Sequence, residues 1–315
     1  MRRHVDQVRA RHPESSSSLD KQTEPPEASS REDEPGTSMH QPNAEPQPPD
    51  EQGEQQSAVP ERLDLPVNPP AELRRSAREP YSCKQVPGKL MQIDAGVGEV
   101  IGVTRDHDIF TLYESSWTHV AGKLKHVTVG PAGTWGVNSG NSIFKLVAAK
   151  WVHVPGLLKQ IDAGGDQFVS GANHHDTPFC LPMDSTVGYT GENSGVNWIS
   201  IAGKLKYYSC GPYSCWGVNS QDQIFWVTSS HCQGVGNWQH IPGSLSMIEV
   251  GGDGSVYGIN SYGNVFRRDS VSRFKPEGTR WTYIPLYSSQ VKHVSYDTGH
   301  LWIILRDDNI YDCTV

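Results

Sequence analysis

W-T-H-V-A-G-K-L-K-H-V, residues 117–127, is a stretch that recurs along the chain and decides its fold. Each copy joins a strand-like W-x-x-V/I segment to a second apolar segment, usually through a Pro-Gly or Ala-Gly pair. Further copies begin at Trp151, Trp198, Trp238 and Trp281, and a truncated copy opens at Cys83. Six copies in one chain indicate a fold that is built from a repeated unit.

A second element follows these copies at a constant spacing. The residues between its two ends are rich in Asn, Ser and Gly, which favour turns. We therefore interpret the element as two short strands joined by a hairpin. Five times, a glycine precedes an aromatic residue by eight positions: Gly102 and Phe110, Gly136 and Phe144, Gly171 and Phe179, Gly217 and Phe225, and Gly258 and Phe266.

The complete unit is thus predicted to contain four short strands. Its copies lie 34, 34, 47 and 40 residues apart, measured between Gly88, Gly122, Gly156, Gly203 and Gly243. Four strands in a period of roughly 35–45 residues are typical of β-propeller blades. The last unit has three strands before Val315, and a fourth is available at residues 81–86. We predict an all-β, six-bladed propeller whose first strand completes the last blade and removes a free sheet edge.

The six cysteines test this closure. Cys83 and Cys313 would lie on adjacent strands of the closing blade, and Cys210 and Cys215 flank the turn C-G-P-Y-S-C. We therefore predict the disulfides Cys83–Cys313 and Cys210–Cys215, which leave Cys180 to pair with Cys232. Such bonds indicate an oxidising compartment. The start M-R-R-H-V-D-Q lacks the apolar segment of a signal peptide, so six reduced thiols stay open as the alternative.

Composition divides the chain near residue 80. Residues 1–80 contain no Phe, Trp, Tyr or Cys and are rich in Pro, Glu, Gln and Ser, so we predict a disordered tail there and a propeller over 81–315. The net charge of −8 disfavours nucleic acid as a partner. The chain has no run of 18 apolar residues, which argues against insertion into a membrane.

The repeated W-x-x-V/I-x-G-x-L and G-V-N…I-F elements resemble those of the tectonin family of β-propellers over about residues 81–315. The resemblance is closest to the fish-egg lectins and more distant to the horseshoe-crab tachylectins. It implies a secreted, six-bladed lectin without enzymatic activity. It also implies N-acetylglucosamine-type sugars and bacterial surface glycans such as lipopolysaccharide as ligands, and a role in innate defence. Calcium and homodimers are implied for some members only, and we expect no required cofactor or metal.

Sugar recognition requires planar hydrogen-bonding groups and an aromatic face against the ring. A turn-stabilising role for the repeated asparagines is the alternative. We do not expect the recurring His119, His153 and His240 to meet at a metal, and the adjacent His174, His175 and Asp176 would diverge on a turn. The candidate sugar-binding residues are Asn138, Asn173, Asn219, Asn260, Asp94 and Asp162.

Aromatic residues precede the glycine of several hairpins and could either stack on a sugar or wedge between blades. They are Trp135, Trp216 and Tyr257, with Trp302 in the last unit. Two other functions stay open beside the lectin. One is an intracellular protein-interaction propeller, which the missing signal favours. The other is a propeller glycosidase, for which no motif stands out.

Overall fold

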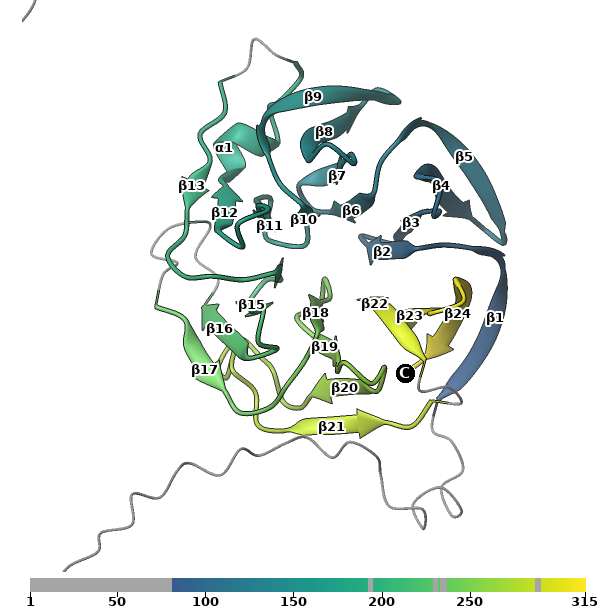
Figure 1. Cartoon of the computed structure of the whole chain (residues 1–315), viewed down its shortest axis with the longest axis vertical. Coiled ribbons are helices and arrows are strands. Elements are labelled where there is room, and N and C mark those ends of the chain that lie inside the picture. The colour runs from purple at the N-terminus through teal and green to yellow at the C-terminus, as the bar shows by residue number, and fades with distance from the viewer. Residues whose placement is uncertain (1–80, 192–194, 229–231, 233–236, 287–289) are drawn as a thin grey trace, which may run out of the picture. The chain divides into compact units, whose positions relative to one another are not determined.

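The computed structural model describes residues 81–191, 195–228, 232, 237–286 and 290–315. Their strands form six four-stranded antiparallel sheets, arranged as blades around a central axis (Figure 1). This confirms the predicted all-β, six-bladed propeller. The predicted tail, residues 1–80, lies outside the described residues.

Each blade begins with its innermost strand and ends with its outermost one. Among the described residues, one short helix, α1 (Met183–Thr186), interrupts the strands, and no helix is long and apolar enough to cross a membrane. The strands of blades 1 to 3 are β2 (Gln92–Gly96), β3 (Glu99–Val103), β4 (Asp108–Tyr113), β5 (Ser116–Lys123), β6 (His126–Gly130), β7 (Gly133–Val137), β8 (Ser142–Val147), β9 (Lys150–Leu157), β10 (Gln160–Asp162), β11 (Val169–Ala172), β12 (Pro178–Leu181) and β13 (Ile199–Ser200).

Blades 4 to 6 follow the same order, except that the outermost strand of blade 6 comes from the start of the propeller. Their strands are β14 (Tyr207–Cys210), β15 (Ser214–Val218), β16 (Ile224–Thr228), β17 (Gln239–Ile241), β18 (Met247–Val250), β19 (Val256–Ile259), β20 (Val265–Arg268), β21 (Trp281–Ile284), β22 (Val291–Asp297), β23 (His300–Leu305), β24 (Asn309–Thr314) and β1 (Ser82–Lys89).

The ring closes as predicted. Strand β1 pairs antiparallel with β24, and the register places Cys83 opposite Cys313. These two cysteines form a disulfide, so the last blade is joined covalently to the first strand. The predicted pairs Cys180–Cys232 and Cys210–Cys215 are also confirmed, and no cysteine is free in the described chain.

The recurring W-x-x-V segment is the outermost strand of its blade, and the glycine after it begins the crossing to the next blade. This glycine has a positive φ, +126° at Gly122, which side-chain-bearing residues rarely adopt. The tryptophan of the following blade packs on it: a Cβ added at Gly122 would lie 2.9 Å from Cδ1 of Trp151. The motif is therefore a contact between blades. The same glycine–tryptophan contact joins Gly88 to Trp117, Gly156 to Trp198, and Gly203 to Trp238.

Hydrogen bonds reinforce three of these contacts. The indole N–H of Trp117 donates to the carbonyl of Pro87, that of Trp198 to Pro155, and that of Trp238 to Ala202, at 2.8–2.9 Å. In each case the acceptor directly precedes the positive-φ glycine. The carbonyl and the glycine together therefore form the seat of the next blade's tryptophan.

The sequence left two roles open for the aromatic residues of the second strands, which were stacking on a sugar and packing between blades. Their burial decides between these roles. Trp135 and Trp216 are fully buried, and Tyr257 and Trp302 are 2% and 7% exposed. Trp216 packs with residues of β18 in the next blade, and Tyr257 packs with Tyr296. These side chains therefore wedge between blades, and their large apolar area stabilises the ring.

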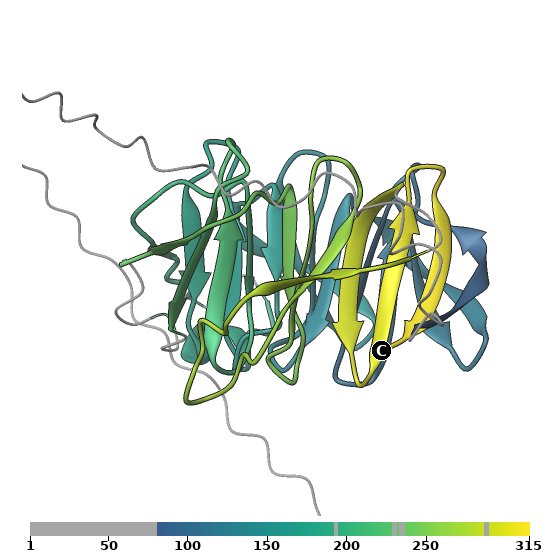
Figure 2. The same cartoon turned by 90° about the horizontal axis from the view of Figure 1, so that it is seen from below.

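The two faces of the ring differ in their turns, and Figure 2 shows the strands running between them. We call the side that carries the turns between the first and second strands of each blade the cavity face. The opposite side carries the hairpins between the second and third strands, and we call it the hairpin face. The glycine–tryptophan crossings lie at the hairpin face, because an outermost strand ends there.

Replacing a glycine that contacts the tryptophan of the next blade should destabilise the propeller more than replacing a positive-φ glycine that has no such contact. Gly122→Ala combines a strained φ with displacement of Trp151, whereas Gly98→Ala meets only the strain, because Gly98 has φ +80° and no atom within 4 Å of an added Cβ. We expect a loss of about 1–2 kcal/mol for Gly98→Ala and a further ~1–3 kcal/mol for Gly122→Ala. Urea unfolding of both variants measures the difference, and equal losses would refute the seat.

The closing disulfide should stabilise the fold more than the local one. Cys83–Cys313 spans 230 residues and Cys210–Cys215 spans 5. The chain-entropy model therefore assigns the closing bond about 3 kcal/mol more stabilisation. Thermal unfolding of the Cys83→Ser/Cys313→Ser and Cys210→Ser/Cys215→Ser double variants should show the larger loss for the first. The reverse order would mean that closure rests on strand pairing alone.

Candidate functional site

The four repeated asparagines lie at the hairpin face, where each stabilises its own turn. The side-chain Oδ1 of Asn138 accepts the backbone N–H of Ser142 at 2.9 Å. Asn173 accepts the N–H groups of His175 and Thr177 at 2.9 and 3.0 Å. Asn219 and Asn260 make the same pair of bonds in their hairpins. Their amide oxygens thus serve the fold, and a sugar-binding role for these side chains stays a prediction.

Asp94 and Asp162 lie instead on innermost strands, next to the central axis. They belong to a ring of equivalent positions, one in each blade, in which an acid alternates with a hydroxyl residue. All are buried, with 6% of Asp94 and 4% of Asp162 exposed. Register places these residues opposite the second strand of their own blade. The members are Asp94, Thr128, Asp162, Ser209, Glu249 and Ser295.

Five members of this ring hydrogen-bond to the next blade in the same way. A side-chain oxygen accepts the backbone N–H of the residue that follows the equivalent position in the neighbour. The bonds are 2.6–3.0 Å long and run from Val129 to Asp94, Ala163 to Thr128, Cys210 to Asp162, Val250 to Ser209, and Ala95 to Ser295. The ring therefore joins the innermost strands around the axis.

Glu249 occupies the remaining position and behaves differently. Its longer side chain reaches the axis, where the Tyr207 hydroxyl and the Asp94 carboxylate hydrogen-bond to it. Ser295 and Thr128 also donate to Asp94, so this carboxylate gathers several donors. The sequence analysis missed Glu249. The alignment of M-I-E-V-G with Q-I-D-A-G, residues 247–251 and 92–96, is the signal that could have found it.

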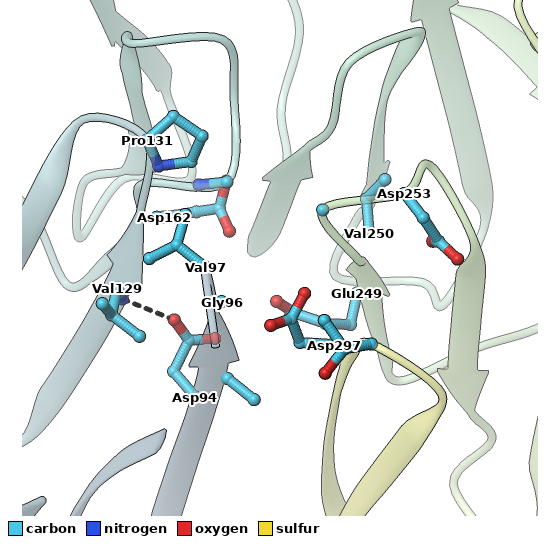
Figure 3. Close-up of a pocket in the computed structure, with 15 residues that line it drawn as sticks. Asp94, Gly96, Val97, Val129, Pro131, Asp162, Glu249, Val250, Asp253 and Asp297 are labelled. Carbon is cyan, nitrogen blue, oxygen red and sulfur yellow. Dashed lines mark hydrogen bonds between the residues drawn. The ribbon is translucent and has the colours of Figure 1, made fainter. Parts of the chain in front are cut away.

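Above these carboxyl groups a cavity of about 310 Å³ opens at the cavity face (Figure 3). The turns that follow the innermost strands form its rim. Asp94, Asp162 and Glu249 line its floor, and Asp253 and Asp297 lie at its edge. The cavity is therefore acidic, and it lies on the opposite face from the asparagine hairpins.

Burial changes the ionisation of the groups on the axis. Desolvation raises the pKa of Asp94 to about 6 and that of Asp162 to about 7, and the neighbouring Asp94 charge adds to the second shift. Desolvation and the same two acids raise the pKa of Glu249 well above its usual range. Glu249 is therefore the proton donor in its bond to Asp94, and the cluster carries less negative charge than three carboxylates would.

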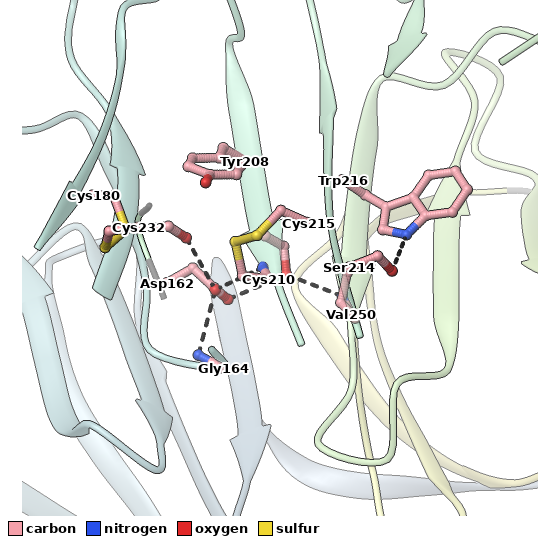
Figure 4. The surroundings of a disulfide bond; sticks show 12 residues. Asp162, Gly164, Cys180, Tyr208, Cys210, Ser214, Cys215, Trp216, Cys232 and Val250 are labelled. Carbon is pink, nitrogen blue, oxygen red and sulfur yellow. Dashed lines mark hydrogen bonds between the residues drawn. A yellow bond between two sulfur atoms is a disulfide. The ribbon is translucent and has the colours of Figure 1, made fainter. Parts of the chain in front are cut away.

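Asp162 also accepts a hydrogen bond from the backbone of Cys210, which belongs to the Cys210–Cys215 disulfide (Figure 4). Its Oδ1 accepts the backbone N–H groups of Cys210 at 3.0 Å and Gly164 at 3.3 Å, and Ser209 donates to Oδ2 at 3.2 Å. Cys210 is bonded to Cys215 across the β14–β15 turn. The disulfide therefore holds the strand that supplies these donors.

A second polar group lies deeper on the axis. The Tyr207 hydroxyl is 3.3 Å from Nε2 of His126 and 3.2 Å from Nε2 of His293. Desolvation lowers the pKa of His126 to about 3 and that of His293 well below its usual range, so both rings are neutral at pH 7. This group connects blades 2, 4 and 6 and joins Glu249 through Tyr207.

No group of three or more His, Cys, Asp or Glu side chains in the described part of the chain is arranged to hold a metal ion. The oxygens of Asp94 and Asp162 face N–H and O–H donors, which a cation would have to displace. Asp94 and Asp162 therefore do not fit a calcium site in this arrangement.

The recurring histidines lie apart, as predicted. His119, His153 and His240 each pack edge-on against the phenylalanine of the neighbouring strand, at ring distances of 5.3–5.6 Å. In the cluster of residues 174–176, the prediction that the side chains diverge is wrong for His174 and His175, because their ring centroids lie 3.7 Å apart. Asp176 points to Lys159 instead and pairs with it. These contacts assign the recurring histidines to the structure of the blades.

Hollows also open between blades in the described part of the chain, and two of them reach the cavity face. The first lies between blades 5 and 6, has a volume of about 380 Å³, and contains Tyr257, Arg267 and Tyr296. The second lies between blades 6 and 1, has a volume of about 330 Å³, and contains Trp302 and Asp312. Both combine aromatic side chains with fixed charges, which the sequence alone did not bring together.

The chain belongs to the tectonin family, because the model of the tectonin domain matches residues 89–306. This confirms the resemblance that the repeats indicated. The chain is 57% identical to a fish-egg lectin of Cyprinus carpio over 234 residues, which cover 73% of this chain and 98% of that one. It is 36% identical to tectonin-1 of Physarum polycephalum over 76 residues, 24% of this chain and 32% of that one.

A solved structure of lower sequence similarity shares the fold. A gluconolactonase of Xanthomonas campestris superposes with a TM-score of 0.56 at 9% identity, covering 74% of this chain and 89% of that one. At this identity the likeness extends to the propeller architecture alone.

The buried Glu249 should make stability depend on pH in a defined direction. Its folded pKa lies above the 4.5 of the unfolded residue. The folded protein therefore binds a proton on Glu249 that the unfolded chain releases. The stability that this neutral carboxyl group gives to the fold is lost as the pH rises through its folded pKa. The side chain of Glu249→Gln stays neutral at every pH. The free energy of unfolding of this variant, minus that of the wild type, should therefore rise by about 1 kcal/mol or more between pH 5 and pH 8.

Urea unfolding at pH 5, 6.5 and 8 measures this gain. The control is Glu99→Gln, which alters an exposed glutamate, and its difference from the wild type should change little over the same range. A pH-independent difference for Glu249→Gln would mean that Glu249 ionises like an exposed carboxyl group.

Proposed function

We propose that the protein is a secreted lectin that binds N-acetylglucosamine-type sugars on bacterial surface glycans such as lipopolysaccharide, in innate defence. The observation that carries this proposal is the 57% identity to a fish-egg lectin over 98% of that protein. Three disulfides support a site of action outside the cell, because reducing compartments disfavour them.

The hollows of the propeller support binding of sugars. The inter-blade hollows offer phenol, indole, guanidinium and carboxylate groups at fixed positions, which suits hydroxyl-rich rings. Both reach turns of the cavity face, at Ser255 and at Thr298. Several weak sites on one face would raise the affinity for a repetitive glycan through effective concentration. A homodimer would double their number.

Binding, and not catalysis, is the activity that we infer. The carboxyl groups on the axis make structural hydrogen bonds to neighbouring blades, and Asp94 and Asp162 are each held by several donors. An intracellular interaction propeller is disfavoured because all six cysteines are paired. The proposal includes no required cofactor.

Affinity chromatography tests the proposed function. The full chain should be retained on N-acetylglucosamine-agarose and elute with the free sugar, and the heat-denatured chain should pass through. Retention in EDTA would support independence from calcium, and its loss would refute that part. Release of chromophore from an aryl N-acetylglucosaminide would contradict a role limited to binding. A glycan array extends the test, and the absence of signal on both supports would overturn the lectin proposal.

A further inference from the structure

The blades present an equivalent pair of side chains to each inter-blade cleft, one from the second strand and one from the third. Members of a pair lie opposite each other in the strand register. The identities differ from cleft to cleft, so each cleft has its own chemistry. The pairs are Ile101 and Thr111, Trp135 and Lys145, Ser170 and Cys180, Trp216 and Trp226, Tyr257 and Arg267, and Trp302 and Asp312.

Protein groups fill the cleft between blades 2 and 3. The Lys145 ammonium lies 5.6 Å from the Trp135 ring centroid and donates to the carbonyls of Thr186 and Tyr189, at 2.7 and 3.2 Å. Tyr189 is itself buried against the Trp135 cluster. The segment around α1 therefore occupies this cleft.

The next two clefts are filled in other ways. Between blades 3 and 4, the buried Cys180–Cys232 disulfide packs beside Cys210. Between blades 4 and 5, the Arg268 guanidinium lies 5.8 Å from the Trp216 ring and 5.3 Å from the Trp281 ring, and it donates to the carbonyl of Glu277.

The cleft between blades 5 and 6 is hollow. Tyr257 and Tyr296 form one wall, with their ring centroids 4.8 Å apart. Ser255 and Ser270 add hydroxyl groups to the lining, and the Tyr296 hydroxyl donates to Asp253 at 3.3 Å. Hydroxyl groups of this kind suit the hydroxyl groups of a pyranose ring.

Arg267 gives this cleft its charge. Its Nε and Nη2 donate to Oδ1 of Asp269 at 3.3 and 3.2 Å, and Arg280 donates to the other carboxylate oxygen at 3.1 Å. Two guanidinium groups thus share one carboxylate, and these three side chains together carry a net charge of +1. The Arg267 side chain is 40% exposed, and three of its five N–H donors remain beyond those used on Asp269.

The neighbouring hollow between blades 6 and 1 has the opposite charge at the same position. Asp312 stands where Arg267 stands, and it pairs with His300 at 2.8 Å. Glu99 and Glu114 also line that hollow. Of these two hollows, the one between blades 5 and 6 therefore has the cation at this position, in a chain whose net charge is −8.

We propose that the cleft between blades 5 and 6 binds a sugar carrying an anionic group, a phosphate or a carboxylate. Arg267 pairs with the anion, and the hydroxyl groups of Ser255 and Ser270 hydrogen-bond to the ring. A guanidinium whose orientation is held by Asp269 matches the planar or branched oxygens of both groups. The inference rests on the proposed lectin function and names the class of sugar that this site prefers.

Isothermal titration of the full chain with matched sugars tests the proposal. N-acetylglucosamine 6-phosphate should bind about tenfold more tightly than N-acetylglucosamine at low salt, as one charge-assisted contact provides. Methyl glucuronide against methyl glucoside tests the carboxylate in the same way. A preference within either pair supports the site and identifies the anion, and equal affinities within both pairs would overturn it.

Variants locate the preference. Arg267→Gln should reduce the ratio of affinities to about one, and Arg267→Lys should retain part of the ratio. Asp312→Asn, at the equivalent position of the next hollow, should leave the ratio intact. Thermal unfolding checks that each variant is folded. An unchanged ratio in folded Arg267→Gln would overturn the assignment.

The outcomes separate this inference from the proposed function. Binding of N-acetylglucosamine without a preference for either anionic sugar refutes the cationic cleft and leaves the lectin proposal intact. The absence of binding to any of the four sugars refutes both.

Discussion

The contact between a positive-φ glycine and the tryptophan of the next blade is the constraint on which the ring depends. Glycine is required because the backbone turns from an outermost strand to the next innermost one at a φ that a side chain disfavours. The indole then occupies the space that a Cβ would take. The turn and the packing therefore need the same residue, which explains why the two residue types recur together.

A ring of this kind needs interactions at its centre as well as at its rim. At the centre, side-chain oxygens accept backbone N–H groups from the neighbouring blade at five of six positions. These bonds satisfy buried backbone donors that the narrow axis hides from water. Glu249 departs from the pattern, because its additional methylene carries the carboxyl group to the axis. The result is a buried acid cluster with raised pKa values at the floor of the central cavity.

Each blade has the same positions facing the next cleft but different residues at them, and this difference explains which clefts are open. Equivalent positions face every cleft, but Lys145, the Cys180–Cys232 disulfide and Arg268 fill three of them. Hollows open where the pairs are Tyr257 with Arg267 and Trp302 with Asp312. The symmetry of the fold thus provides equivalent positions, and the residues at these positions decide which clefts are open.

The sequence by itself determined the number of blades, the strand that closes the ring and the three disulfides. It could do so because the repeat spacing is local and a closed ring leaves few ways to place the first and last strands. Only the tertiary structure decided that Asp94 and Asp162 share a ring with Glu249, that the asparagines lie on the opposite face, and which clefts are open. Those facts depend on side chains from different blades, 35 to 201 residues apart in their hydrogen-bonded pairs, that meet only when the ring has closed.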